Sequence, residues 1–369
     1  MKRFFPLIFL LLFLAIIAGA NIYLSRRFNF YFAIENTRLL YLAFPATTAF
    51  MVFGMMPLSN STKRWGNIIY MLAAIVMGVL LYLILSVLLV EAVNIFAHFS
   101  PKNRGILALA ITSLVSVYGV FNAWNVQVTQ QEIGITGLSK EIRIMHLSDI
   151  HIGHFRGKIF LEKIVRKVNR QNVDAVFITG DLFDGVINLS KESLAPLTDI
   201  HKPIFFVEGN HDKYSGVQMV KNYLTEINIH VLENEIYHWN GLQIIGLNHM
   251  AADSETFNIH TTGQKNTIKS TLESLSPDKS KPTLLLHHSP DGIQYASNHG
   301  VDLYLAGHTH AGQLFPIKYI AGLIFQYNKG LHSFNETKLF VSQGAGTFGP
   351  PMRVGTKSEI TRIHLKPIK

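Results

Sequence analysis

Hydrophobic residues follow two different patterns along this chain. In the first third they form four uncharged runs, each close to the ~20 residues that an α-helix needs to cross a bilayer. The runs are Phe4–Leu24, Leu39–Leu58, Asn67–Val90 and Gly105–Trp124. Further along, the apolar runs shrink to about five residues and break into polar residues, which is the pattern of buried strands. The sequence therefore predicts an all-α transmembrane bundle of four spans in residues 1–125, followed by an α/β domain.

Basic residues concentrate around the long apolar runs. Residues 1–125 hold nine Lys or Arg and two Asp or Glu, whereas residues 126–369 hold 24 and 22. A basic excess beside apolar runs is typical of membrane anchoring, so the lipid bilayer is an expected partner. Nucleic-acid binding is not expected, because the second part of the chain has no basic stripe. The charges that would flank the two membrane surfaces are nearly equal in number, so the side on which the second part lies is not predicted.

The second part of the chain is divided by its pattern into a linker and a domain. Residues 126–140 are predicted to be a linker that starts as a strand and continues as a turn-rich connector, and the domain is expected over residues 141–369. Amphipathic spacing predicts helices, which are Ile159–Asn169 and, more weakly, Gln218–Ile227 and Thr267–Leu275. Beyond His310 two short alternating segments are expected to be antiparallel strands that close the sheet, namely Lys338–Ser342 and Glu359–Leu365.

Five of the predicted strands end in Asp, Asn or His. The five segments are Ile144–His151, Val176–Asp181, Phe205–Asp212, Leu284–His288 and Leu303–His310. Ligands of open α/β sheets collect at the carboxyl ends of the strands, so these side chains are expected to share one site. The candidates are Asp149, His151, Asp181, Asp184, Asn210, His211, His287, His288, His308 and His310.

The candidate side chains suit metal ions. The chain has no cysteine, which excludes thiolate sites, and mixed imidazole and carboxylate ligands favour Mn, Fe or Zn over Ca or Mg. The set is too large for one ion, whereas two divalent ions about 3.5–4 Å apart and joined by one carboxylate would use most of it. Such a pair deprotonates a bridging water at neutral pH and clamps phosphoryl oxygens.

The order and spacing of these motifs resemble those of the calcineurin-like metallophosphoesterase superfamily. The matching motifs are Asp149-x-His151, Gly180-Asp181-x-x-Asp184, Gly209-Asn210-His211-Asp212, His288 and Gly307-His308-x-His310. The segments Gly307–Gln313 and Gln343–Arg353 are similar to its membrane-associated branch, which includes bacterial phosphodiesterases and UDP-2,3-diacylglucosamine pyrophosphatases. The resemblance covers about residues 141–312. It implies a four-layer α/β domain, with two sheets packed face to face and helices outside, at a bacterial cell membrane.

The resemblance also implies a role for each matching residue. The first metal ion would be held by Asp149, His151 and His310, and the second by Asn210, His288 and His308, with Asp181 bridging both. His211 would be the general acid for the leaving group, and Asp184 would orient and charge it. Manganese is the favoured metal.

Two assignments have alternatives. His287 and His288 are adjacent and would face opposite ways from a strand. His288 is favoured because the family pattern places the ligand two residues before a proline, here Pro290. Asp212 could be a ligand, but capping the following helix is the favoured interpretation. His146 is expected in the core, and His154, His249 and His332 are expected at the surface or behind the site.

These features together predict a membrane-anchored, two-metal phosphoesterase. It would hydrolyse a phosphodiester or pyrophosphate bond with a metal-bridging hydroxide, and its membrane location is compatible with a lipid-linked substrate. The segment Leu314–Tyr327 follows the last ligand and is apolar. It is interpreted as a loop packed on the sheet, or alternatively as an apolar flap beside the metals. The alternative function is a membrane sensor or scaffold that binds its ligand without turnover. The substrate, the oligomeric state and the role of the spans are not predicted.

Overall fold

The structure is a computed structural model that describes residues 5–187, 189–255 and 266–368, without the side chains of residues 5–10, 12 and 13. The chain divides into two compact units. The first holds the N-terminal helices, and the second holds residues 121–348 and 352–369 with all the strands named below.

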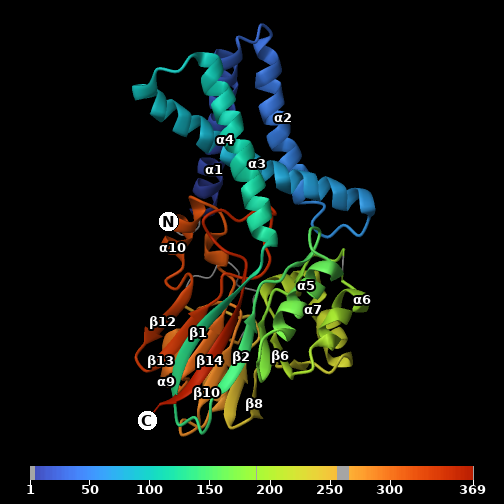
Figure 1. Ribbon diagram of the computed structural model, residues 1–369, viewed down its shortest axis with the longest axis vertical. Coiled ribbons are helices and arrows are strands. Elements are labelled where there is room, and N and C mark those ends of the chain that lie inside the picture. The colour runs from blue at the N-terminus through green and yellow to red at the C-terminus, as the bar shows by residue number, and fades with distance from the viewer. Residues whose placement is uncertain (1–4, 188, 256–265, 369) are drawn as a thin grey trace. The chain divides into compact units, whose positions relative to one another are not determined.

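Four long helices form the N-terminal unit (Figure 1). They are α1 (Phe5–Phe32), α2 (Thr37–Met55), α3 (Arg64–Ala97) and α4 (Pro101–Trp124). Among the described residues, α2, α3 and α4 are long and apolar enough to cross a membrane. The first predicted run, Phe4–Leu24, begins outside the described residues and continues in α1. Three candidate spans are therefore present, and the fourth stays a prediction.

One carboxylate in this unit is surrounded by cationic and hydroxyl groups. Glu91 on α3 lies 3.2 Å from an Arg27 nitrogen and 3.4 Å from an Arg104 nitrogen, and it accepts a 2.6 Å hydrogen bond from the Tyr31 hydroxyl. These contacts join α1, α3 and α4. Glu91 thus connects three helices of this unit.

The first sheet of the second unit has six strands in the order β1-β14-β2-β4-β6-β7. Their bounds are β1 (Gln127–Thr136), β14 (Glu359–Ile368), β2 (Ile142–Leu147), β4 (Ala175–Thr179), β6 (Ile204–Val207) and β7 (His230–Val231). Strand β1 pairs in parallel with β14 along ten residues, from Gln127 with Glu359 to Thr136 with Ile368. The predicted linker at 126–140 is therefore mostly an edge strand of this sheet. Strand β14 is antiparallel to β2, as expected, but parallel to β1.

The second sheet also has six strands, in the order β12-β13-β11-β10-β9-β8. Their bounds are β12 (Gly330–Phe334), β13 (Thr337–Val341), β11 (Leu303–Ala306), β10 (Thr283–Leu286), β9 (Leu242–Gly246) and β8 (Glu235–Trp239). The inner four strands are parallel, so β13 is antiparallel only to β12. A short pair, β3 (Ile152–Gly153) with β5 (Phe183–Asp184), lies apart from both sheets.

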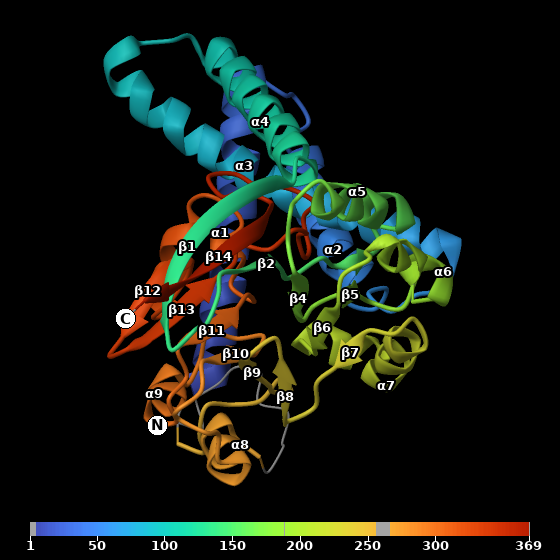
Figure 2. The same ribbon diagram turned by 60° about the horizontal axis from the view of Figure 1, so that its bottom comes forward.

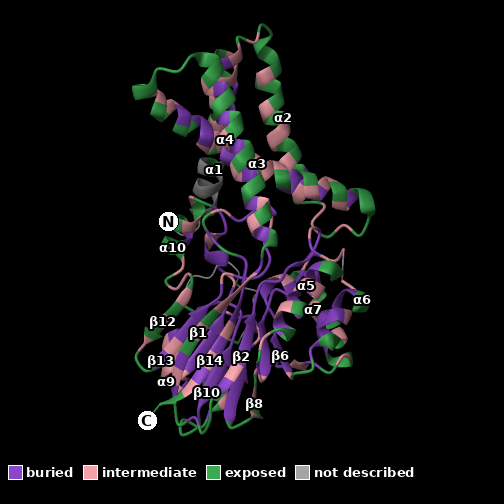
Figure 3. Cartoon of the chain, in the orientation of Figure 1, coloured by how far each residue is buried: buried purple, intermediate pink, exposed green. Residues whose placement is uncertain are grey.

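The two sheets enclose an apolar layer. Ile144 and Phe177 from the first sheet share one buried cluster with Leu284, Leu305 and Phe340 from the second. A strand that is buried on both faces has a continuous run of apolar residues. The five strands that end in candidate ligands therefore show no alternation of apolar and polar residues. Figure 3 shows these strands as almost wholly buried.

Helices cover the outer faces of both sheets (Figure 2). The first sheet packs on α5 (Lys158–Asn169) and α7 (Asn210–Glu226), near α6 (Lys191–Leu194) and the 3₁₀ turn η1 (Ala195–Asp199), and the second packs on α8 (Ile268–Leu275) and α9 (Ile293–Asn298). Helix α5 confirms the amphipathic spacing of its sequence, with Phe160, Leu161, Ile164, Val165 and Val168 buried. Helix α7 starts eight residues before the predicted segment, with a first turn capped by Asp212, and it breaks at Gly216 (φ 103°), just before the stretch predicted from the sequence. The unpredicted helix α10 (Ile317–Ile324) lies within Leu314–Tyr327 and follows the 3₁₀ turn η2 (His310–Gly312).

Candidate active site

The candidate site residues lie on tight turns that follow the strands. Five of them have left-handed backbone: Asp149 (φ 52°), His151 (53°), Asp181 (52°), His308 (72°) and His310 (48°). This conformation costs a residue with a Cβ roughly 1–2 kcal/mol, and it persists where the surroundings enforce it. Two hydrogen bonds enforce it here, from the Asp149 amide to the Gly180 carbonyl (3.1 Å) and from the His151 amide to the Asp181 carbonyl (3.0 Å).

The first cluster of ligand-type atoms comes from Asp149, His151 and His310. The Nε2 atoms of His151 and His310 lie 3.0 Å apart, and His310 Nε2 lies 3.3 Å from Asp149 Oδ1. Burial lowers the pKa of His151 to about 3 and that of His310 well below its usual value. Both imidazoles are therefore neutral, so each has a lone pair available for a cation.

The second cluster comes from Asp181, His288 and His308. His288 Nε2 lies 3.1 Å from Asp181 Oδ2 and 3.2 Å from His308 Nδ1. Asp181 Oδ2 also lies 3.7 Å from His151 Nε2 of the first cluster. This single carboxylate is therefore within reach of both clusters, as a bridging ligand would be.

Asn210 provides a test of whether metal ions suit the site. Its Oδ1 is buried and has no hydrogen-bond partner among the described residues, although a buried acceptor is normally paired. Burial and the neighbouring Asp181 charge also raise the pKa of Asp149 to about 6, although His288 and the Ser148 hydroxyl partly offset them. A cation beside these oxygens would give Asn210 Oδ1 a partner and would compensate the buried charge of Asp149. The donor set therefore fits divalent metal ions.

The structure separates the two adjacent histidines. His287 points away from the clusters, where its Nδ1 lies 2.8 Å from the Ser289 carbonyl and its Nε2 accepts from the Met250 amide at 3.3 Å. His288 uses Nδ1 to donate to the Thr179 carbonyl at 2.7 Å, which leaves Nε2 facing Asp181. This geometry supports His288, and not His287, as the ligand.

Asp212 caps helix α7, as favoured from the sequence. Its two carboxylate oxygens accept from the amides of Gly209 (2.9 Å) and Phe183 (3.0 Å). Gly209 itself passes so close to Asp181 that an added Cβ would lie 2.1 Å from Asp181 Oδ1. The Gly-Asn-His-Asp motif therefore combines a close backbone approach, two site residues and a cap.

His211 lies at the rim of the site and contacts Asp184, its predicted partner, as well as Asp181. Its Nδ1 is 2.9 Å from Asp184 Oδ1, and its amide donates to Asp181 Oδ1 at 2.9 Å. Burial opposes protonation of the ring, but the carboxylates of Asp181 and Asp184 outweigh it and raise the pKa to about 9. The imidazole is 26% exposed, so it is both charged and accessible to a substrate.

The Asp184→Asn substitution should shift the pH profile. A proton donor is active below its pKa, and loss of the Asp184 charge destabilises the imidazolium and lowers the pKa of His211. We therefore expect the alkaline limb of kcat/KM to move to lower pH by about one unit or more. Profiles of the two proteins at equal metal content would measure this, and an unmoved alkaline limb would contradict the role of Asp184.

Arg353 is a site-supporting residue that sequence reasoning did not identify. Its guanidinium is fully buried and donates to the carbonyls of Gln343, Gly344 and Gly346, and it lies 3.1 Å from His310 Nδ1. The loop that it organises donates from the Gly346 amide to the Asp149 carbonyl at 2.7 Å. Arg353 thus fixes the turns that carry Asp149 and His310. Its only sequence signal is its place in the Gln343–Arg353 motif, because no periodicity marks it.

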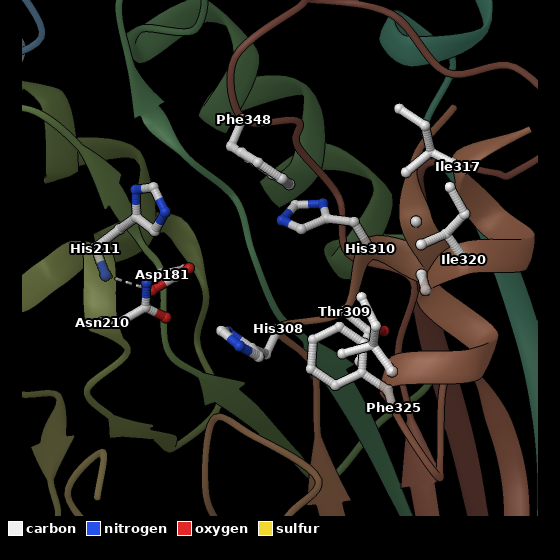
Figure 4. A pocket seen from close by; sticks show the side chains of 13 residues that line it. Asp181, Asn210, His211, His308, Thr309, His310, Ile317, Ile320, Phe325 and Phe348 are labelled. Carbon is white, nitrogen blue, oxygen red and sulfur yellow. Dashed lines mark hydrogen bonds between the residues drawn. The ribbon is translucent and has the colours of Figure 1, made fainter. Parts of the chain in front are cut away.

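A pocket of about 250 Å³ opens onto the clusters and has two chemically different sides (Figure 4). One side carries Asp181, Asn210, His211, His308 and His310. The other is apolar and comes mainly from α10, namely Ile317, Ile320, Ala321, Ile324 and the adjacent Phe325, with Phe348 from the C-terminal loop. Phe325 packs edge-on against His308 at 5.7 Å, and Phe348 contacts His310 at 5.0 Å. The apolar side therefore begins directly beside the polar one.

Comparison with known proteins places this geometry in a family. The calcineurin-like phosphoesterase family model matches residues 142–312. An uncharacterized metallophosphoesterase of Helicobacter pylori is 36% identical over 65% of this chain and 64% of its own length. One of Aquifex aeolicus is 30% identical over 69% of this chain and 98% of its own length. A Bos taurus transmembrane protein with a metallophosphoesterase domain is 33% identical, over 71% and 62% respectively.

The chain spans slightly less than two thirds of the Helicobacter and Bos relatives, but nearly all of the Aquifex one. The family match covers every strand end that carries a candidate metal ligand. The chain therefore belongs to the calcineurin-like metallophosphoesterases, a family of metal-dependent phosphoester hydrolases.

Proposed function

We propose that this protein is a membrane-anchored phosphoesterase that uses two metal ions to hydrolyse a phosphodiester or pyrophosphate bond. The observation that carries the proposal is the position of Asp181, whose Oδ2 lies 3.1 Å from His288 in one cluster and 3.7 Å from His151 in the other. A carboxylate shared between two buried imidazole clusters is the arrangement that a pair of ions needs. The apolar N-terminal helices support placement in a membrane, for which we propose a multi-pass topology in a bacterial cell membrane.

The site residues divide into ligands and a proton donor. Asp149, His151 and His310 would hold one ion, Asn210, His288 and His308 the other, and Asp181 both. When bound, the ions lower the pKa of a coordinated water and offset the charge of the phosphoryl group. His211 would donate its proton to the leaving oxygen from the rim, and Asp184 would keep the ring charged and correctly turned through the 2.9 Å contact.

The proposal is tested with the full chain purified in detergent. Metal content and hydrolysis of chromogenic phosphomonoester and phosphodiester substrates would be measured after loading with Mn²⁺ or Zn²⁺. Metal-dependent diester cleavage would support the proposal. Two bound ions without turnover on these or on lipid substrates would favour the sensor or scaffold instead, and no bound metal would overturn both.

The apolar side of the pocket favours a lipid-linked substrate. Leu314–Tyr327 is not a plain surface loop, because it contains α10, whose Ile320 and Ile324 are 53% and 60% exposed beside the site residues. Exposed apolar surface next to a catalytic pocket is costly in water unless a ligand covers it. An acyl chain attached near the phosphoryl group would lie against this side.

Replacing Ile324 and Phe325 with Ser should lower kcat/KM on a lipid-linked phosphoester by roughly 10²-fold to 10⁴-fold. Each large apolar side chain that a ligand covers contributes about 1.5–3 kcal/mol, and tenfold corresponds to about 1.4 kcal/mol. Activity on a short soluble ester should be nearly unchanged. The measurement is a parallel assay of both substrates in mixed micelles.

Leu323→Ser is the matched control for this double substitution. Leu323 lies on the same helix and is 88% exposed, but it does not line the pocket. It should therefore leave both activities intact if the pocket wall is what matters. Equal losses on the lipid and on the soluble ester in the double variant would refute the acyl-chain assignment.

A further inference from the structure

His249 follows a strand in the same way as the predicted ligands. Strand β9 (Leu242–Gly246) is buried, runs parallel to β10 and is followed by Leu247, Asn248 and His249. We propose that His249 is a further ligand of the second metal ion, beside His288 and His308. This inference rests on the two-metal function proposed above, and it extends the ligand set by one imidazole.

The surroundings of His249 leave its ring without a partner. The residue is 1% exposed, and neither ring nitrogen has a hydrogen-bond partner among the described residues. A neutral imidazole carries one donor and one acceptor, and burying both unpaired is costly. By contrast, buried His146 bonds through Nε2 to the Thr179 hydroxyl at 2.8 Å and leaves only Nδ1 unpaired among the described residues, and His287 uses both of its nitrogens. His249 therefore needs a partner that these other buried histidines already have.

The ring positions are compatible with a shared ion. The centroid of His249 lies 5.7 Å from that of His288 and 6.0 Å from that of His308, while those two lie 5.0 Å apart. A metal–nitrogen bond of about 2.0–2.1 Å places the centroid of a coordinating imidazole roughly 3.2 Å from the ion, so two such rings are at most about 6.4 Å apart. All three separations fall within this limit. His249 is not part of the present cluster of Asp181, His288 and His308, so its ring would turn toward the ion on binding.

The backbone around His249 is fixed on both sides. The Asn248 amide donates to Asn234 Oδ1 at 2.9 Å, and the Met250 amide donates to His287 Nε2 at 3.3 Å. The His249 carbonyl accepts from Lys213 Nζ at 2.5 Å, which ties this turn to the start of α7. The ring also stacks on His287, with centroids 5.8 Å apart and planes at 6°. These hydrogen bonds fix the backbone of the turn and leave both ring nitrogens available for an ion.

A third imidazole changes the metal preference of this site. His249, His288 and His308 would give it three nitrogen ligands, beside the oxygens of Asp181 and Asn210. Imidazole-rich sites favour Zn or Fe, whereas Mn prefers carboxylate and carbonyl oxygen. The second site should therefore select Zn²⁺ over Mn²⁺ more strongly than a site with two imidazoles, in contrast to the manganese expected from the family resemblance.

The test is metal binding by the full chain in detergent, compared with His249→Phe. After chelation, the number of bound ions and their affinities would be measured by competition with a chromophoric chelator, for Zn²⁺ and Mn²⁺ separately. For the more weakly bound of the two Zn²⁺ ions, we expect the affinity of the variant to be at least about 100-fold lower than that of the wild type. The affinity for Mn²⁺ should change much less. Metal-free His249→Phe should unfold at the same or a higher temperature than the wild type, because an unpaired polar ring is gone.

His146→Phe is the control for removing a buried imidazole. It should lower the unfolding temperature of the metal-free protein, since Thr179 loses its bond, and should leave metal selectivity unchanged. If His249→Phe bound Zn²⁺ with the same affinity and selectivity as the wild type, this result would overturn the inference, even if the variant bound two ions and retained turnover. So would a lower unfolding temperature of the metal-free variant with unaltered binding, which would make His249 structural. A wild type that binds no ion would overturn the proposed function as well.

Discussion

The Asp181→Asn substitution should lower phosphoesterase activity by at least about 10³-fold and reduce the bound metal from two ions to one or fewer. Asp181 Oδ2 lies within 3.7 Å of one imidazole cluster and 3.1 Å of the other, so one change affects both proposed sites. The amide keeps the shape but removes the charge that holds two dications close together. Each 1.36 kcal/mol of lost transition-state stabilisation costs tenfold, and metal ions supply several kcal/mol.

The metal-free state separates this effect from misfolding. Asp181 lies among other buried carboxylates, and its charge adds to burial in raising the pKa of Asp149 to about 6 and that of Asp212 to about 7. The charges of His288 and His211 outweigh burial and hold the pKa of Asp181 itself well below its usual value, so the metal-free variant should unfold at a lower temperature than the wild type. Metal content is therefore compared below that temperature, where both proteins are folded. Metal content and thermal unfolding after chelation would be measured together, with exposed Asp278→Asn as the control. Two tightly bound ions in Asp181→Asn would disprove the bridging role.

The ligand set could be predicted because its signal is local. Each proposed ligand directly follows a buried strand or stands within a few residues of one, and parallel order brings these ends to one edge. The choice of His288 over His287 could be made from Pro290 and is supported by the direction of the two rings. His249 also follows a buried strand, β9, but it belongs to none of the family motifs, so from the sequence it is expected at the surface or behind the site.

Other features depend on partners that are distant in the sequence. Strand β1 is polar at many positions because it is an edge strand, and its partner β14 begins more than 200 residues later. Nothing within residues 126–140 indicates that pairing, so the segment resembles a linker. Arg353 is equally invisible, since a buried arginine is stabilised only by the carbonyls that the fold brings to it. Helix α10 is short and mostly apolar, so its sequence fits a packed loop as well as a helix.

The His211→Gln substitution should lower kcat on an alkyl phosphodiester by about 10²–10⁴-fold, which is the usual contribution of a general acid. An alkoxide leaves poorly without a proton, and His211 is the rim residue whose pKa, about 9, keeps it protonated near neutral pH. A p-nitrophenyl ester needs little protonation, because its leaving group is already a weak base. The loss on that substrate should therefore stay within about tenfold.

The comparison of the two substrates decides whether His211 acts through its proton. His211 lies in a third group of possible ligands with His151 and Asp184, but its Nδ1 is already paired with Asp184 at 2.9 Å. It lies outside the two clusters proposed to hold the ions, so the variant should keep its bound metal. Metal analysis and assays of both esters would be run beside His238→Gln, an exposed histidine on β8 that should change neither activity. Equal losses on the alkyl and p-nitrophenyl esters would mean that His211 positions the substrate or the metals and does not donate a proton. If activity is lost on the alkyl ester but kept on the p-nitrophenyl ester, whose leaving group needs no proton, then the His211 imidazolium held by Asp184 protonates the departing oxygen.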